Sequence, residues 1–289
     1  MIATRNVICF LLLTFGVTWL AAAGIFVAGG MSNLPVYVAG GAAVMLVPAT
    51  AAAVVRRRFH EGFHDACLRV GKLRYYALTY GLLVLWAALA FGLTWTTSLG
   101  RFDPDMSSLQ GHLPPDKIAQ ARHQIAAARP WLGLVALFGP FMNLPFTLGE
   151  ELGWRGYLLV RLLPLGTLRA VLLTGAIWGL WHAPFILMGH NYPGHGAAGV
   201  PLAVICFTVL GWLFGWLFLK SGSVLVPAFA HACANLFGSS LSLVTADFNP
   251  LLGGAAGIIS IGIVALVAGA LWFCFPPHKA KASGAVTSP

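Results

Sequence analysis

Apolar runs that are each long enough to cross a bilayer constrain this chain more than any other feature. About 20 consecutive apolar residues span the hydrocarbon core as a helix, and a backbone surrounded by lipid must satisfy its own hydrogen bonds. We therefore expect an all-α polytopic membrane protein, a bundle of about eight transmembrane helices. The predicted spans are residues 6–28, 35–55, 76–98, 131–162, 168–188, 198–219, 223–245 and 251–275.

Composition agrees with this interpretation. Of the 289 residues, 58% are hydrophobic and 9% are charged, whereas a soluble domain has about 25% charged residues. We expect a single integral membrane domain over residues 1–289, with a disordered tail at 276–289. Pro140 and Pro145 are expected to break the fourth run into two portions, because proline interrupts helical hydrogen bonding.

The net charge of +9 is not a nucleic-acid signal. The basic residues cluster in the short connections between apolar runs, so no nucleic-acid partner is expected. Cytoplasmic connections are enriched in Lys and Arg, which places the basic connection 56–75 in the cytoplasm. Alternation then puts both termini in the cytoplasm and the 99–130 connection outside. Within that connection, PDKIAQARHQIAAARP predicts an amphipathic surface helix.

Two acidic residues, Glu150 and Glu151, lie deep inside an apolar run. A charged side chain at the bilayer centre costs at least about 2.5–3.5 kcal/mol, so both need partners inside the protein or a wet cavity. Glu151 and Arg155 share a helix face and are predicted to pair. Glu150 is turned by about 100° from Glu151, and its expected partners are His182 and His231 on other spans.

Two later spans carry polar residues at a similar depth. His182 lies one turn after Trp178, and His231 lies four residues before Asn235, on the same helix face. Glu150, His182 and His231 would lie roughly 14–20 Å from the cytoplasmic ends of their helices, near the middle of the bilayer core. Because polar groups that face lipid are costly, we expect them to converge inside the bundle. Taken singly, each could be a structural ion pair, a satisfied core histidine or a bond between helices.

A carboxylate, two histidines and an amide around one cavity suit hydrolysis by activated water. A desolvated carboxylate acts as a general base, a histidine shares that role or binds a metal, and a histidine and an amide donate to an oxyanion. Two His and one Glu form a known zinc set. His182 and His231 are therefore candidate ligands of a divalent metal, Zn²⁺ if any is bound. The H-E-x-x-H signature is absent, which leaves the metal open.

The segments EELGWR, WGLWH and HACAN occur in this order on three spans. They resemble the motifs EExxxR, FxxxH and HxxxN of the CAAX prenyl protease and bacteriocin-processing (CPBP, Abi-type) family of intramembrane endopeptidases. Trp178 replaces the usual Phe of the second motif. The family-like catalytic core covers about 140–240 of the chain. The matching residues are Glu150, Glu151, Arg155, His182, His231 and Asn235.

The resemblance implies a bundle of eight helices with a catalytic cavity facing the cytoplasm, and cleavage of a peptide bond near a membrane-bound C-terminus. It also implies a classification with metalloproteases, in which the role of the metal is open. The implied roles are base for Glu150, helper for His182, oxyanion donors for His231 and Asn235, and helix brace for Glu151 and Arg155.

We therefore predict an intramembrane endopeptidase that hydrolyses a peptide bond in a membrane-associated protein or peptide. Its partners would be that substrate and the lipid bilayer, and the compact sequence with its basic inner loop indicates the bacterial inner (cytoplasmic) membrane. Two alternatives stay open. One is a proton-coupled transporter, since intramembrane Glu and His form proton relays, although the sequence has no inverted repeats. The other is a non-catalytic immunity or partner-binding protein.

Overall fold

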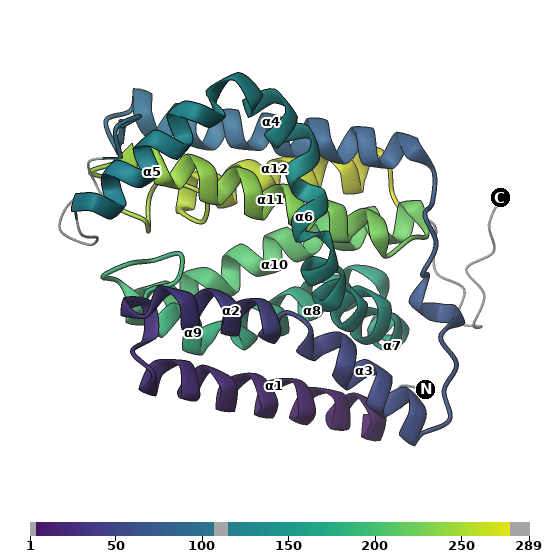
Figure 1. Cartoon of the computed structure of the whole chain (residues 1–289). Coiled ribbons are helices and arrows are strands. Elements are labelled where there is room, and N and C mark those ends of the chain that lie inside the picture. The colour runs from purple at the N-terminus through teal and green to yellow at the C-terminus, as the bar shows by residue number, and fades with distance from the viewer. Residues whose placement is uncertain (1–3, 107–114, 278–289) are drawn as a thin grey trace.

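The computed structural model describes residues 4–106 and 115–277, which form a bundle of α-helices (Figure 1). The α-helices are α1 (Thr4–Val27), α2 (Leu34–Val44), α3 (Val47–Arg58), α4 (Leu73–Thr96), α5 (Pro115–Ala128), α6 (Leu132–Gly153), α7 (Val160–Leu162), α8 (Thr167–Trp181), α9 (Ala183–Leu187), α10 (Gly196–Ser221), α11 (Leu225–Leu243) and α12 (Ile258–Cys274). Short 3₁₀ turns are η1 (Gly30–Ser32), η2 (His64–Ala66), η4 (Arg129–Trp131) and η6 (Leu163–Leu165), and η5 (Trp154–Leu159) is a π-helical turn. Strands β1 (Arg101–Phe102) and β2 (Thr245–Ala246) pair in antiparallel fashion.

The predicted all-α polytopic membrane fold is confirmed. Each expected span contains a helix. Among the described residues, four stretches are long and apolar enough to cross a membrane: Thr4–Val27, Leu34–Arg58, Leu73–Thr96 and Gly196–Ser221. Helices α8 and α12 are shorter but also apolar. Large apolar side chains such as Leu20, Leu266 and Phe273 are strongly exposed, which suits a surface that contacts lipid.

The segment predicted as a surface helix, PDKIAQARHQIAAARP, does form α5. Most of the predicted disordered tail, residues 278–289, lies outside the described residues, so that expectation stays a prediction.

The predicted break at Pro140 and Pro145 is wrong. Helix α6 runs through both prolines and packs against α3 on one side and α11 on the other. A proline in a helix interior costs about 3 kcal/mol, and packing against neighbouring helices outweighs such a cost in membrane proteins. The regular helix ends instead at Gly153, where the chain widens into the π-helical turn η5.

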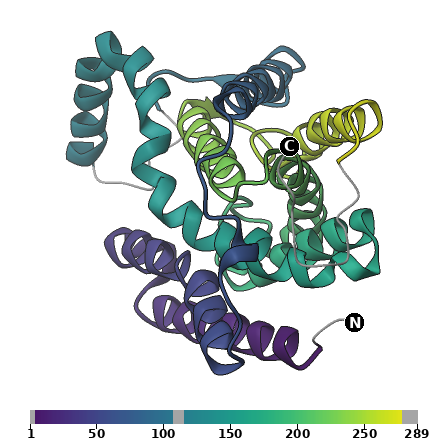
Figure 2. The ribbon, with the colours of Figure 1, turned by 90° about the vertical axis from the view of Figure 1, so that its right-hand side faces the viewer.

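Close helix contacts place the polar residues of different spans near one another. A Cβ atom at Gly175 of α8 would lie 2.8 Å from Thr208 Cα of α10, and one at Gly149 of α6 would lie 2.8 Å from the carbonyl oxygen of Met45. Such distances exclude any larger residue, so these glycines allow the backbones to approach. Figure 2 shows α6 running between the group formed by α1, α2 and α3 and the group that contains α4, α11 and α12.

Candidate active site

The two intramembrane glutamates lie near the end of α6 and are buried, with exposed fractions of 2% for Glu150 and 0% for Glu151. Glu151 Oε1 accepts a hydrogen bond of 2.9 Å from Nη1 of Arg155 in η5. The predicted Glu151–Arg155 pair is therefore confirmed. Arg155 is itself only 1% exposed, so this ion pair is shielded from water on both sides.

Glu151 has a second partner on α11. The Nδ1 atom of His231 lies 3.1 Å from Glu151 Oε1. The expectation that His231 would pair with Glu150 is wrong, because the helix face that directs Glu151 to Arg155 also directs it to α11. Within the described part of the chain, the buried atoms Glu151 Oε2 and Arg155 Nη2 have no hydrogen-bond partner.

Glu150 is held by Trp178 of α8, whose indole Nε1 donates to Glu150 Oε2 at 2.7 Å. Neither histidine makes a hydrogen bond to Glu150 among the described residues, so the expected His182 partner is also replaced. The sequence contained a signal for this contact. A buried indole N–H requires an acceptor, and Trp178 lies one turn before His182 in an otherwise apolar span.

His182 lies at the joint between α8 and α9, and its Nδ1 is 2.9 Å from the carbonyl oxygen of Trp178. A carbonyl oxygen only accepts hydrogen bonds, so Nδ1 carries a proton, and in the neutral ring Nε2 keeps its lone pair. The ring stacks on Phe207 of α10, with centroids 4.0 Å apart and planes 7° apart. Tautomer and ring orientation are therefore both fixed by neighbours.

Trp178 is the common neighbour of this group. Its ring contacts His182 and His231, with centroids 5.7 Å and 5.3 Å away, and the guanidinium carbon of Arg155 lies 4.4 Å from its centroid. We call Glu150, Glu151, Arg155, Trp178, His182 and His231 the Trp178 cluster. Asn235 lies one turn after His231 on α11 and is half-buried, and it makes no hydrogen bond within the described residues.

Residues 127–237 match the family described as Type II CAAX prenyl endopeptidase Rce1-like. The matched segment contains every motif residue and confirms the resemblance stated from the sequence. At the level of the family it implies a CAAX-protease-like membrane endopeptidase, and the apolar helices make the protein an integral membrane protein. No curated protein matches the chain.

The Rce1-like segment contains His182 and His231, the two residues expected to bind a divalent metal. In the described residues, no three His, Cys, Asp or Glu side chains gather closely enough to hold a metal ion. The Nδ1 atoms of His182 and His231 are already engaged, which leaves only the Nε2 atoms as possible ligands. The divalent metal therefore stays a prediction.

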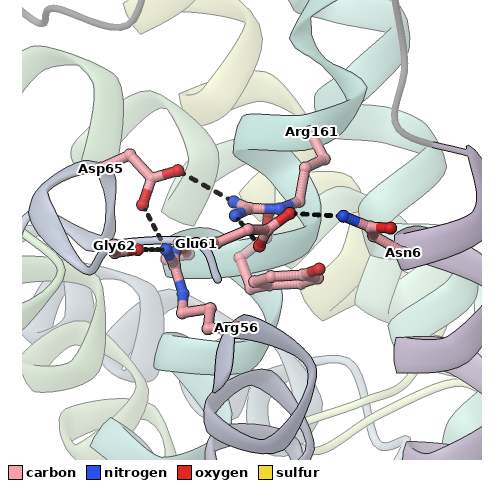
Figure 3. Close-up of polar contacts among 8 residues, drawn as sticks. Asn6, Arg56, Glu61, Gly62, Asp65 and Arg161 are labelled. Atoms are coloured by element: carbon pink, nitrogen blue, oxygen red, sulfur yellow. Dashed lines mark hydrogen bonds and ion pairs between the residues drawn. The ribbon is translucent and has the colours of Figure 1, made fainter. Parts of the chain in front are cut away.

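A second polar cluster joins the Rce1-like segment to the basic loop before α4 (Figure 3). Arg161 of α7 reaches Glu61 at 2.5 Å and Asp65 at 3.0 Å, and Arg56 of α3 reaches Asp65 at 2.6 Å. Asn6 of α1 donates to Glu61 at 2.7 Å. We call Arg56, Glu61, Asp65 and Arg161 the loop cluster.

The loop cluster borders a cleft and contacts η5, the turn that follows the helix of the two glutamates. The cleft has a volume of about 390 Å³, and Glu61, His64, Asp65 and Arg161 are among its lining residues. Arg56 Nη2 donates to the carbonyl oxygen of Gly156 in η5 at 2.9 Å. The sequence carries no signal for these ion pairs, because their members lie on separate elements.

Proposed function

We propose that this protein is an intramembrane endopeptidase that hydrolyses a peptide bond in a membrane-associated protein or peptide, with water activated by Glu150 and His182. One observation carries the proposal. Glu150 is buried in the Rce1-like segment with a neutral donor as its hydrogen-bond partner, while the neighbouring cation Arg155 is bonded to Glu151. A buried carboxylate that is not bonded to a cation is costly, and such groups cluster at functional sites.

Glu150 is suited to the role of general base. Its Oε2 accepts the indole N–H of Trp178, and its Oε1 accepts no hydrogen bond from the described residues. Oε1 is therefore available to take a proton from water. His182 supports the same role, because Nδ1–H on the Trp178 carbonyl leaves the Nε2 lone pair free to orient that water or accept its proton.

His231 and Asn235 are proposed to stabilise the oxyanion. Because Nδ1 of His231 faces the Glu151 carboxylate, Nε2 can donate a hydrogen bond only when the ring is doubly protonated. Glu151 then balances the imidazolium charge, so this carboxylate has a structural and electrostatic role rather than that of a base. The Asn235 amide, one turn along α11, would supply a second donor.

In the proposed reaction, one proton of the attacking water passes through Glu150 to the leaving amine. The water oxygen adds to the carbonyl carbon of the substrate while its proton passes to Glu150. The resulting oxyanion accepts hydrogen bonds from His231 and Asn235. The C–N bond then breaks, Glu150 returns the proton to the leaving amine, and a new carboxylic acid and a new amine are released.

Cysteine is a poor alternative nucleophile in this chain. Cys206 and Cys233 are buried and unpaired. In the loop before α4, burial raises the pKa of the Cys67 thiol. A thiol with a raised pKa is a weak nucleophile, which favours activated water.

For location, we propose the bacterial inner membrane with both termini in the cytoplasm. The last turn of α3 carries Arg56, Arg57 and Arg58, and cytoplasmic connections are enriched in such residues. The cytoplasmic location of the termini is tested by attaching a reporter to each terminus and measuring whether it can be reached from outside the cell. Reaction of either terminus with an impermeant reagent in intact cells would contradict the assignment.

The substrate is unidentified, so the first test compares whole membranes. Cells that express the wild type or Glu150→Gln are analysed by mass spectrometry for new peptide termini in membrane proteins. The proposal predicts termini that occur with the wild type and disappear with Glu150→Gln and with His182→Ala. Glu61→Gln, a carboxylate change in the loop cluster, is the matched control and should retain them. Termini that persist in both Glu150→Gln and His182→Ala would show that the cluster is not catalytic.

A further inference from the structure

Trp178 touches both members of the proposed base pair through different atoms. Its side-chain N–H donates to Glu150 Oε2, and its main-chain carbonyl oxygen accepts from His182 Nδ1. The residue is fully buried, so neither contact competes with water. Trp178 therefore sets the positions of both the Glu150 side chain and the His182 ring.

The hydrogen bond to Glu150 is of a strong type. A bond from an N–H to a carboxylate is charge-assisted and stronger than one between neutral partners. Low local polarity strengthens it further. By fixing Oε2, this bond also fixes the direction of Oε1, which is the oxygen proposed to take the proton of water.

The ring of Trp178 is held from several sides. Arg155 covers it at 4.4 Å from the centroid. Phe207 and His231 meet it in T-shaped contacts with centroids 4.6 Å and 5.3 Å away. Because side chains from η5, α10 and α11 all pack on the ring, its N–H has one well-defined direction.

We propose that Trp178 is a positioning residue that fixes Glu150 relative to His182 for the attack of water. The inference rests on the proposed function. It adds that in this chain, where Trp178 stands in place of the usual Phe, the indole N–H and not merely the aromatic ring positions Glu150.

The test removes the N–H and keeps a ring. Trp178→Phe is compared with two matched changes at buried tryptophans: Trp181→Phe, whose N–H is bonded to Thr18 at 2.9 Å, and Trp154→Phe, whose N–H has no partner within the described residues. Activity is measured in proteoliposomes. The substrate is one whose new peptide termini were identified by mass spectrometry, as described above. Since a misplacement of about 1 Å can cost about a hundredfold in rate, we expect kcat of Trp178→Phe to fall by about ten- to a hundredfold with KM nearly unchanged. Trp181→Phe and Trp154→Phe should keep the wild-type kcat.

A second readout does not depend on activity or on the folding of Trp178→Phe. In protein with ¹⁵N-labelled indole groups, the N–H resonance of Trp178 should shift strongly in Glu150→Gln, while that of Trp181 should not. An unshifted Trp178 resonance would overturn the inference.

The outcomes of the kinetic test are separable. If Glu150→Gln is inactive and Trp178→Phe keeps its full kcat, the positioning role is wrong and the proposed function stands. If all three Trp→Phe variants lose kcat equally, the effect is one of packing and the positioning role is wrong. If Glu150→Gln is itself fully active, the proposed function fails.

Discussion

The Trp178 cluster and the loop cluster differ in how completely their charges are paired. In the loop cluster, Arg161 contacts both Glu61 and Asp65, and Arg56 also contacts Asp65. Both carboxylates are partly exposed, with side-chain exposures of 20% for Glu61 and 23% for Asp65. Each acid of the loop cluster thus has a cation partner and some access to water.

The Trp178 cluster is buried more deeply, and its charges are paired less completely. Arg155 forms its ion pair with Glu151, and His231, another side chain of the cluster that can carry a positive charge, also lies against Glu151. Within the described residues, the hydrogen-bond donor of Glu150 is the neutral N–H of Trp178. Complete pairing is what a structural cluster needs, because a buried charge without a partner is costly. The incomplete pairing of Glu150 is what a group that must accept a proton needs.

The largest expected effect on stability comes from Arg155→Met. Removing one partner of a buried ion pair costs about 3–5 kcal/mol, because Glu151 would keep only His231. Arg161→Met is the matched change in the loop cluster. It should cost clearly less, since Glu61 and Asp65 are partly solvated. Unfolding in SDS measures both. An equal loss of stability in the two variants would contradict the proposed difference in burial and charge pairing between the two clusters.

The next effect, measured as a rate, is expected for His231→Ala. Loss of an oxyanion donor costs about 10²- to 10³-fold in kcat. His64→Ala, at the cleft of the loop cluster, should leave kcat unchanged. Steady-state cleavage in proteoliposomes provides the comparison. A wild-type kcat in His231→Ala would show that this ring does not contact the reacting atoms.

The smallest effect is expected for Arg56→Lys. Lysine keeps the charge but cannot bond to Asp65, the Gly62 carbonyl oxygen and the Gly156 carbonyl oxygen at once. Losing such a bond costs about 0.5–1.5 kcal/mol. Arg57→Lys, at the exposed neighbouring residue, should cost nothing measurable. The same unfolding assay tests both, and equal stability of Arg56→Lys and wild type would show that the contact to η5 is not stabilising.

The sequence predicted the features that follow from spacing along one helix. Length and polarity identified the spans, and the four-residue spacing identified the Glu151–Arg155 pair. Equal depth predicted that polar residues of α6, α8 and α11 would approach one another, and the structure places Glu150, His182 and His231 around Trp178.

What the sequence did not predict depends on contacts between helices. Trp178 can donate to Glu150 because α8 is rotated so that the indole faces α6. That rotation is set by the packing of α8 on α10, through positions such as Gly175. The continuity of α6 through Pro140 and Pro145, and the π-helical turn after Gly153, likewise depend on the neighbours of that helix. The pairing of Arg161 with Glu61 joins residues 100 positions apart, a separation at which local patterns carry no information.

The role of Glu150 as the base is tested by the cleavage rates of two purified carboxylate variants. A membrane substrate identified by its new termini is reconstituted in proteoliposomes with the wild type, Glu150→Gln or Glu61→Gln, each shown to be folded. The incompletely paired carboxylate is predicted to be essential, so Glu150→Gln should lose cleavage by at least about a hundredfold while Glu61→Gln stays close to the wild-type rate. Cleavage by Glu150→Gln at the wild-type rate would contradict the assignment of Glu150 as the base.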